Sequence, residues 1–313
     1  SNAKLGKGNW AVLEADESDG SFLNFPINYS VVTNIDKEHM EFYKNFKNLK
    51  KSFLKFLNKT PLIGKSFVCI DNYEISKLVK KLKNKNFYSY GFSKKANFQI
   101  LKPLYKKDHS IFDLKISIPG EKIKIIKKIR LNLIGSHNIL NSVAAISLCL
   151  HIGINIKIIK KSLKGFSGIQ RRLTKLFTLK SREFFDDYAH HPTEIKSVLK
   201  SLKITSNKRK IISVFQPHRY SRLRLLKKDF SSSFKDSDLV VLCPVYAAGE
   251  KIDRRYNSFN FAKSITRDSN VQVVIVNDQK DLNNFFKKNL IENEIVICMG
   301  AGSISKWLRE MKL

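Results

Sequence analysis

Polar clusters with residue types suited to catalysis lie just after stretches of β-forming residues. The first is LEADESDGSF, from Leu13 to Phe22, in which Glu14, Asp16, Glu17 and Asp19 stand close together. Like charges at this spacing repel one another unless a cation or a helix N-terminus compensates them. Glu14 ends a predicted strand, and ligands of open α/β sheets gather at the carboxyl ends of strands. A divalent-cation site and a solvated acidic turn both remain open.

A second predicted strand also ends in polar residues, the segment TNIDKEHM over 33–40. His39 lies just beyond this strand end, where its imidazole could reach the same crevice as Glu14 and complete a metal site. A lone histidine is more often a surface or capping residue. Both interpretations of His39 therefore stay open.

Arginine and histidine clusters follow in the second half of the chain. Arg171 and Arg172 stand at a predicted domain junction, where a guanidinium is suited to stabilising charge on a phosphoryl group. The segment DDYAHHPTE (186–194) follows a strand, and its Pro192 and Glu194 have the types expected at a helix start.

The segment FQPHRYSR (215–222) is another strand exit, and it carries Arg219 and Arg222. An arginine makes two parallel hydrogen bonds to a carboxylate or phosphate, which a lysine does not.

The elements that must position these residues alternate between β-rich runs and helix-sized stretches, which predicts an α/β fold with a largely parallel sheet. The first half has candidate strands at 9–14, 29–34, 66–70 and 87–92, an alternating region at 97–133 that predicts a small antiparallel sheet with a turn at Pro119-Gly120, and a helix at 137–151. The second half predicts a doubly wound unit with strands at 210–215, 238–243, 271–276 and 294–299. We place a domain boundary near 170, giving domains 1–170 and 171–313.

The formal net charge of +31 favours a nucleic-acid or membrane-surface partner when taken alone. The lysines, however, are spread over nearly every segment, and the dense runs at 44–60, 122–130 and 157–165 interleave them with apolar residues, as solvated faces of amphipathic elements do. A basic nucleic-acid-binding module remains the alternative from a different class.

Targeting signals and cysteine motifs do not appear in the sequence. No stretch is apolar for the roughly 18 residues that a membrane helix needs, so we expect a cytosolic protein. The four cysteines lie singly in apolar runs, as buried thiols do.

Two phosphate-binding patterns are incomplete. LIGKSF (62–67) contains Gly-Lys-Ser, but a P-loop needs a glycine where this chain has Lys59. MGAGSIS (299–305) follows a strand, yet its third glycine position is Ser305 and too little chain follows for the acid that binds a ribose. A P-loop at 62–67 and a nicotinamide site at 299–305 are therefore not expected.

The order of EADESDGSF, TNI followed by HM, GSHNILN, the double arginine, DDYAHHPTE, FQPHRYSR, YAAGE and MGAGSI resembles the Mur ligase family of ATP-dependent amino-acid ligases. Within that family it resembles the ligases for L-alanine. The ligases that recycle murein tripeptide are the alternative, but these are expected to carry a DEYD-type motif and to lack PHRYSR. The resemblance implies a partial central ATPase-type α/β domain followed by a doubly wound, Rossmann-like C-terminal domain.

The resemblance also assigns roles to individual residues. It implies magnesium ligands at Glu14 and His39, with Glu17 as the competitor for Glu14, although the family usually has Asp where this chain has Glu38. The remaining roles are adenine and ribose contacts at Asn138, Asn141 and Asp187, catalytic groups at Arg172, His191, Arg219 and Arg222, and a substrate site bordered by His190, Tyr246 and Glu250.

The reaction implied is the joining of L-alanine to UDP-N-acetylmuramate, with ATP and Mg²⁺ as cofactors and an acyl phosphate as intermediate. No specific nucleic acid and no membrane are expected as partners. The family's UDP-binding domain and its Gly-Lys-Thr phosphate loop do not occur within these 313 residues. We therefore expect a fragment that is inactive alone, with a hinge near 170.

Overall fold

A computed structural model describes residues 3–253 and 255–311. They form two compact units. The first comprises the described residues up to Lys102 with Phe112–Ile129 and Leu140–Ile159, and the second comprises Pro103–Ile111, Arg130–Ile139 and the described residues from Lys160 on. The single boundary near 170 stays a prediction, because parts of three strands and two helices group with the second unit.

A six-stranded sheet organises the N-terminal half, with its strands in the order in which they occur along the chain. Strands β1 to β4 are parallel neighbours. The turn between β4 and β5 spans only 106–109, which is too short for a parallel crossover and agrees with the antiparallel pairing predicted for 97–133. The separate small sheet predicted there does not form, because β4 pairs with β3 and the three strands extend the parallel sheet. The strands are β1 (Tyr29–Val32), β2 (Lys65–Cys69), β3 (Phe87–Gly91), β4 (Phe98–Tyr105), β5 (Ser110–Ile116) and β6 (Lys124–Leu131).

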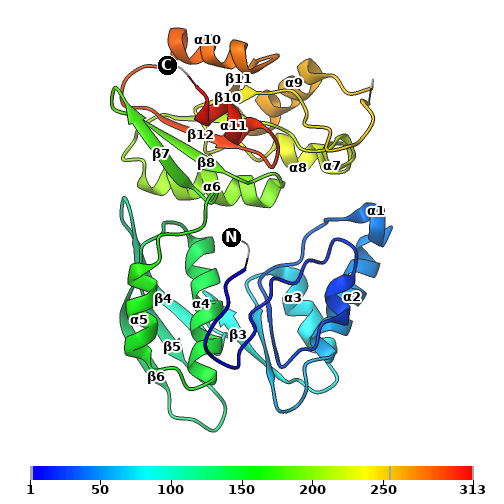
Figure 1. Cartoon of the computed structure of the whole chain (residues 1–313), viewed down its shortest axis with the longest axis vertical. Coiled ribbons are helices and arrows are strands. Elements are labelled where there is room, and N and C mark those ends of the chain that lie inside the picture. The colour runs from blue at the N-terminus through cyan, green and yellow to red at the C-terminus, as the bar shows by residue number, and fades with distance from the viewer. Residues whose placement is uncertain (1–2, 254, 312–313) are drawn as a thin grey trace. The chain divides into compact units, whose positions relative to one another are not determined.

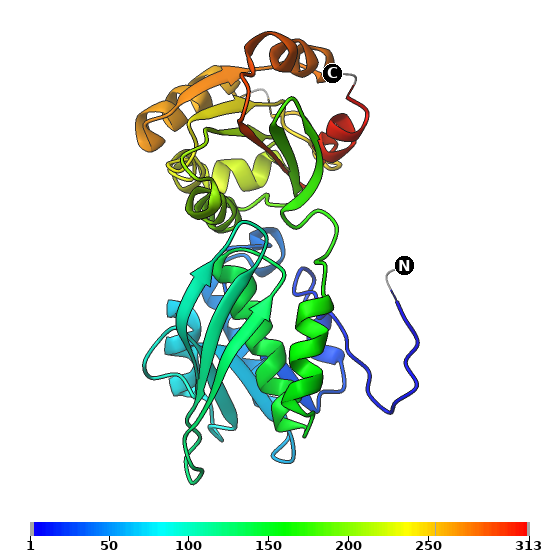
Figure 2. The same cartoon turned by 90° about the vertical axis from the view of Figure 1, so that its left-hand side faces the viewer.

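Helices connect these strands as the hydrophobic patterns predict. The lysine-rich run at 44–60 forms α2, which buries Leu49, Phe56 and Leu57 and leaves most of its lysines outside. Asn45 caps α2 by accepting a hydrogen bond from the Asn48 N–H. Helices α4 and α5 lie side by side (Figures 1 and 2). The helical segments are η1 (Ser21–Asn24), α1 (Met40–Tyr43), α2 (Phe46–Asn58), α3 (Tyr73–Leu78), η2 (Val79–Lys81), α4 (Ser136–His151) and α5 (Ile156–Gly165).

The strand predicted at 9–14 does not form. The segment is described but pairs with no strand, and its apolar side chains are exposed, with Val12 at 93% and Trp10 and Leu13 at 60% each. Trp10 contacts Tyr29 at 5.7 Å between ring centroids, so the segment passes β1 without joining the ladder. β-forming residues make a strand only where a neighbour satisfies the backbone N–H and C=O groups.

A second six-stranded sheet organises the C-terminal half, in the order β11-β10-β9-β12-β8-β7. All pairs are parallel except the β7–β8 hairpin. From β9 the chain moves outward to β11 and then returns to β12 on the other side of β9, so the strand order reverses there. The strands are β7 (Thr174–Leu179), β8 (Arg182–Asp187), β9 (Ile211–Phe215), β10 (Leu239–Leu242), β11 (Gln272–Ile275) and β12 (Ile295–Met299).

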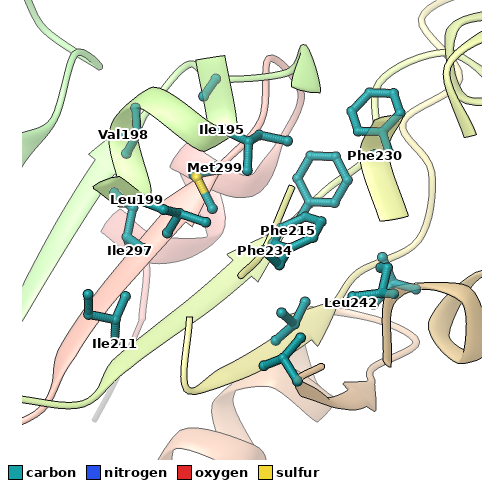
Figure 3. Packing of buried hydrophobic residues seen from close by; sticks show 14 of the residues in the cluster. Ile195, Val198, Leu199, Ile211, Phe215, Phe230, Phe234, Leu242, Ile297 and Met299 are labelled. Atoms are coloured by element: carbon teal, nitrogen blue, oxygen red, sulfur yellow. The ribbon is translucent and has the colours of Figure 1, made fainter. Parts of the chain in front are cut away.

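The core of this sheet is almost wholly aliphatic and aromatic. Figure 3 shows Ile195 and Leu199 of one helix packed toward Ile297 and Met299 of β12, and all four are fully buried. Because both faces of the central strands are covered, these strands have continuous apolar runs, as the sequence indicated. The helices are α6 (Pro192–Thr205), α7 (Tyr220–Leu225), α8 (Lys227–Ser231), α9 (Ser258–Ser269), α10 (Gln279–Asn289) and α11 (Ile304–Arg309).

The four cysteines are free thiols, three of them buried and Cys149 partly so. Within 3–253 and 255–311, no helix combines the length and the apolar character needed to cross a membrane.

Candidate functional site

Four neighbouring strands of the C-terminal sheet end at one edge, and each is followed by residues singled out in the sequence. β8 leads into DYAHHPTE, β9 into QPHRYSR, β10 into the segment with Tyr246, and β12 into Gly300. Parallel strands place their carboxyl ends together, and the edge beside a reversal of strand order is where open α/β sheets bind ligands. The sheet therefore assembles one polar site from segments far apart in sequence.

A row of rings crosses this site. Ring centroids are separated by 5.2 Å between Tyr188 and His190, by 5.8 Å between His190 and His218, and by 5.5 Å between His218 and Tyr246. The last pair is stacked, at an interplanar angle of 15°. These contacts bring residues from the exits of β8, β9 and β10 into one continuous surface.

The two junction arginines lie over the first ring of the row, with guanidinium carbons 4.7 Å (Arg171) and 5.7 Å (Arg172) from the centroid of Tyr188. Arg171 is held firmly, because its Nη2 donates to the Gly300 carbonyl at 2.6 Å and its carbonyl accepts from the Tyr188 N–H at 2.8 Å. Arg172 is about half exposed, and its Nη1 donates to Glu194 Oε1 at 3.4 Å. Of the two, Arg172 has the side chain that can reach a ligand.

Asp187 ends β8 and is almost completely buried. Its two carboxylate oxygens accept from the backbone N–H groups of Leu173 at 2.6 Å and Ala189 at 2.7 Å. Burial raises the pKa of Asp187 to about 6, against the opposing effect of these two N–H groups. The carboxylate thus links the segment after the junction arginines to the end of β8. The ribose contact predicted for Asp187 stays a prediction.

His191 is the N-cap of α6. Its Nδ1 accepts from the Thr193 N–H at 3.3 Å, while Glu194, three residues further on, turns back to accept from the N–H groups of His190 at 2.9 Å and His191 at 3.2 Å. This reciprocal capping box satisfies N–H groups that the first turn of a helix leaves open. His191 therefore has a structural role in addition to any catalytic one.

The exit of β9 carries Arg219 in an unusual backbone conformation, with φ 69° and ψ 131°. The N–H of Arg219 donates to the Tyr246 carbonyl at 2.8 Å, which fixes this turn against the exit of β10. Arg222, one turn along α7, lies 3.2 Å from Nδ1 of His218 through its Nη1. Burial, reinforced by Arg222, lowers the pKa of His218 to about 4, so this histidine is neutral near pH 7.

Glu250 is tied to the start of α7. One of its oxygens accepts from the Ser221 N–H at 3.1 Å and the other from the Ser221 hydroxyl. Burial acts to raise the pKa of Glu250, but the Ser221 hydrogen bonds hold it below its ordinary value. Glu250 and Tyr246 thus both lie beside the FQPHRYSR segment, as the sequence suggested.

The predicted metal residues of the N-terminal unit are arranged differently from expectation. His39 Nε2 lies 3.8 Å from Glu17 Oε1, and His39 Nδ1 lies 3.6 Å from Glu41 Oε1. Glu14 is exposed and is not part of this group. Within the described ranges, no three His, Cys, Asp or Glu side chains converge as a metal cluster would.

Asn138 and Asn141 both lie in the first turns of α4. The Asn138 amide donates to the Ile134 carbonyl at 2.8 Å, which is a local helix-start contact, whereas Asn141 is exposed. The predicted adenine contact of both residues remains a prediction.

Three residues of the C-terminal site were not assigned a role from the sequence. Tyr188 and His218 form part of the row of rings, and Glu194 contacts both Arg172 and His190. The only advance signal for Glu194 was its place three residues after a helix cap, which is also an ordinary structural pattern.

Comparison with known proteins gives two family matches. Residues 2–149 match the Mur ligase middle domain, and residues 171–302 match the domain described as Mur ligase, glutamate ligase domain.

Curated relatives cover nearly the whole chain. The UDP-N-acetylmuramate–L-alanine ligase of Pelagibacter ubique (strain HTCC1062) is 52% identical over 310 residues, which cover 99% of this chain and 67% of that protein. The ligase of the same name from Jannaschia sp. (strain CCS1) is 37% identical over 98% of this chain and 64% of its own length. The chain thus spans about two thirds of the length of these relatives.

Among solved structures, the UDP-N-acetylmuramate-alanine ligase of Thermotoga maritima superposes with a TM-score of 0.74 at 24% identity, covering 95% of this chain and 61% of that one. A murein peptide ligase of Psychrobacter arcticus gives a TM-score of 0.63 at 15% identity over 92% of this chain and 57% of that one. At these identities the two structures support the fold.

Proposed function

Because the chain belongs to the Mur ligase family, we propose that it is part of an ATP-dependent ligase that joins L-alanine to UDP-N-acetylmuramate. The observation that carries this proposal is the meeting of DDYAHHPTE, FQPHRYSR and YAAGE at one edge of the C-terminal sheet. Relatives with 52% and 37% identity over nearly the whole chain bear the name of this ligase.

In the proposed reaction, the lactyl carboxylate of UDP-N-acetylmuramate attacks the γ-phosphate of ATP and forms an acyl phosphate. The amine of L-alanine then attacks the acyl carbon and releases phosphate. Two anions must approach each other in the first step, so catalysis depends mainly on positive charge placed in advance. Arg172 supports this role, because its half-exposed guanidinium is already oriented by Glu194.

Arg219 and Arg222 supply positive charge at the other end of the row of rings, beside Tyr246 and His218. We propose that they bind the carboxylate of L-alanine or a phosphate oxygen, with His190, Tyr246 and Glu250 bordering the same site. Asn138, Asn141 and Asp187 are proposed to contact the nucleoside, as the family resemblance implies. His191 keeps a proposed catalytic role beside its capping role.

For Mg²⁺, the donor pair that fits best is Glu17 with His39, since these two side chains are within reach of a common ion. One or two protein ligands suffice for Mg²⁺, which keeps several waters. A bound Mg²⁺ would offset negative charge on the phosphates. Glu14, the first choice from the sequence, is exposed and apart from His39, so we propose Glu17 in its place.

These 313 residues contain no complete P-loop motif, and backbone N–H groups of such a loop are the usual cradle for ATP phosphates. We therefore propose that the 313-residue chain alone does not catalyse ligation. Alanine-dependent phosphate release by this chain would contradict that proposal. Because the proposed reaction uses ATP as phosphoryl donor, we expect it to take place in the cytosol.

The test of function uses the chain joined to the upstream third that the longer relatives possess. With ATP, Mg²⁺ and UDP-N-acetylmuramate present, we expect phosphate release that depends on L-alanine. Omission of each substrate in turn is the control. If murein tripeptide replaces L-alanine as the preferred substrate, the recycling ligase is the correct assignment. If neither substrate supports phosphate release, both assignments are refuted.

A further inference from the structure

Three histidines lie in the C-terminal site, and their neighbours differ in a way that bears on proton transfer. His218 faces a guanidinium, His191 caps a helix, and His190 faces a carboxylate. Groups that exchange protons during catalysis are recognised by environments that favour different protonation states. The three environments therefore indicate which of the histidines can accept a proton.

His218 is unsuited to accept a proton. The Arg222 guanidinium can only donate, so Nδ1 of His218 is the acceptor in their 3.2 Å contact and its hydrogen lies on Nε2. Burial and Arg222 lower the pKa of His218 to about 4, and a second positive charge there is disfavoured. His191 is also less suited to accept a proton, because its Nδ1 already accepts from the Thr193 N–H and its ring is buried.

His190 has the opposite environment. Its Nδ1 lies 3.0 Å from the Tyr188 carbonyl oxygen and 3.3 Å from Glu194 Oε2. A carbonyl and an ionised carboxylate only accept hydrogen bonds, so Nδ1 must carry the hydrogen. In the neutral ring the lone pair is then on Nε2, and the carboxylate next to Nδ1 stabilises the imidazolium once Nε2 takes a proton.

Glu194 links this histidine to the junction arginine. One oxygen accepts from Arg172 Nη1 at 3.4 Å, and the other accepts from the N–H groups of His190 and His191. Burial acts to raise the pKa of Glu194, yet His190, Arg172 and the two backbone N–H groups together hold it below its ordinary value. The side chain is therefore an ionised acceptor at neutral pH.

We propose that Glu194 is a positioning residue that holds His190 as its Nδ1–H tautomer, so that Nε2 of His190 accepts the proton that the ammonium group of the incoming amino acid must lose. Groups that contact His190 include Tyr188, Glu194 and His218, with Arg172 on the far oxygen of Glu194. The role of His190 toward an amino acid rests on the proposed function, whereas its tautomer does not depend on that function.

The proton balance is simple. One ammonium proton passes to Nε2, and the nitrogen lone pair that this exposes forms the C–N bond at the acyl carbon. The C–O bond to phosphate then breaks, and its electron pair leaves with the phosphate oxygen. The second N–H proton leaves with the phosphate, and the imidazolium returns its proton to water. Glu194 remains ionised throughout and exchanges no proton.

The first experiment uses the 313-residue chain and needs no catalysis. The ring nitrogens of ¹⁵N-labelled histidine are observed by long-range ¹H–¹⁵N correlation, and His190→Gln identifies the signals of His190. We expect the Nδ1–H pattern for His190 in the wild-type chain at alkaline pH. An Nε2–H pattern there overturns the proposal, whatever the enzyme does.

Glu194→Gln tests the cause. Its amide oxygen can still accept from the two backbone N–H groups and the Tyr188 carbonyl remains, but the negative charge that faces Nδ1 is lost. The Nδ1–H tautomer of neutral His190 should therefore be less populated and its ring-nitrogen shifts should move toward averaged values, whereas Glu310→Gln, which removes an exposed carboxylate near Lys306, should leave the signals unchanged. Unchanged His190 signals in folded Glu194→Gln would refute the role of Glu194. The wild-type measurement decides the tautomer even if this variant does not fold.

The second experiment uses the full-length ligase. Glu194→Gln should lower kcat with L-alanine by roughly tenfold or more and shift the acidic limb of the pH–rate profile, with little change in the KM for L-alanine. A nucleophile that is unprotonated at the assay pH, hydroxylamine, should react at a nearly wild-type rate. An equal loss with both nucleophiles would assign Glu194 a merely structural role. A wild-type enzyme without alanine-dependent turnover would instead refute the proposed function.

Discussion

Arg219 and Asp187 each occupy a state that an isolated residue of the same type disfavours. Arg219 has positive φ without being glycine, and Asp187 is a carboxylate with almost no exposure to water. Such states cost on the order of 1–3 kcal/mol and persist only where the surroundings determine them. Here the surroundings are the Tyr246 carbonyl for Arg219 and two backbone N–H groups for Asp187. Both residues lie at strand ends of the proposed site.

Replacing Arg219 with Gly and with Ala separates backbone strain from side-chain contacts. Glycine accepts φ 69°, whereas alanine keeps the Cβ and therefore the strain. We expect Arg219→Gly to have a free energy of unfolding about 1 kcal/mol higher than Arg219→Ala in urea titrations of the 313-residue chain. The matched control is Arg224, inside α7, where Gly should be less stable than Ala by a similar amount. The same order at both positions would contradict the strain argument.

The buried carboxyl of Asp187 predicts an unusual pH dependence. Its folded pKa of about 6 lies above the unfolded value of roughly 3.9, so the folded state binds more protons between these values. The contribution to stability is complete below about pH 4 and is lost as the pH rises through 6, by on the order of 3 kcal/mol. The wild type should therefore lose stability relative to Asp187→Asn between pH 4 and pH 7, as measured by the two free energies of unfolding. A constant difference between the two free energies over this range would show that folding does not raise the pKa of Asp187.

At the scale of elements, close approach of backbones explains a motif that resembles a phosphate loop. Gly64 of the Gly-Lys-Ser triplet stands directly before β2, and Lys65 and Ser66 are the first residues of that strand. A Cβ added to Gly64 would lie 1.7 Å from the carbonyl oxygen of Asn28, just before β1. The glycine therefore lets two neighbouring parallel strands begin side by side.

Gly64→Ala tests this explanation. Because the obstructing atom is backbone, β1 or β2 must shift, and we expect a loss of more than about 2 kcal/mol in the free energy of unfolding. Gly165, at the end of α5, has no atom within 4 Å of an added Cβ. Gly165→Ala should be neutral or stabilise slightly, because alanine is the better helix former. Thermal unfolding of both variants measures the contrast, and similar behaviour would rule out the steric reason for Gly64.

For the whole molecule, the formal charge of +31 coexists with carboxylates that are paired inside the C-terminal unit. Asp186 is fully buried and accepts from Ser305 and Arg309 of α11, and Glu183 accepts from Lys175 and Arg209. Burial opposes ionisation of Glu183, but its two cationic partners lower its pKa to about 2. The net excess thus resides mainly on solvated lysines, which favours general attraction to anions over a specific site.

Binding to a polyanion should accordingly show no sequence preference and strong salt dependence. If six phosphates are contacted, affinity for single-stranded RNA should fall by roughly 300-fold between 50 and 200 mM salt. Fluorescence anisotropy with two unrelated RNA sequences measures both properties. Sequence-specific or salt-resistant binding would support the nucleic-acid-binding alternative against the ligase.

The sequence by itself determined most elements and the family. Apolar runs identified β1 to β3 and β9 to β12 to within a few residues. The signal is continuous in central strands such as β9 and β12, which are buried on both faces. It also identified the helix at 137–151, observed as α4, and the segments that lie at strand ends. It failed at 9–14, because β-forming side chains do not reveal whether a pairing partner is present.

Only the tertiary structure decided how those segments meet. Hydrogen-bond partners and burial depend on neighbours distant in sequence, so the sequence could not separate the helix cap His191 from His190 beside a carboxylate, or Glu14 from Glu17 beside His39. Nor could it show that Glu194 contacts Arg172 across 22 positions. Residue types fix which chemistry is available, whereas strand order and close packing fix which of those residues share a site.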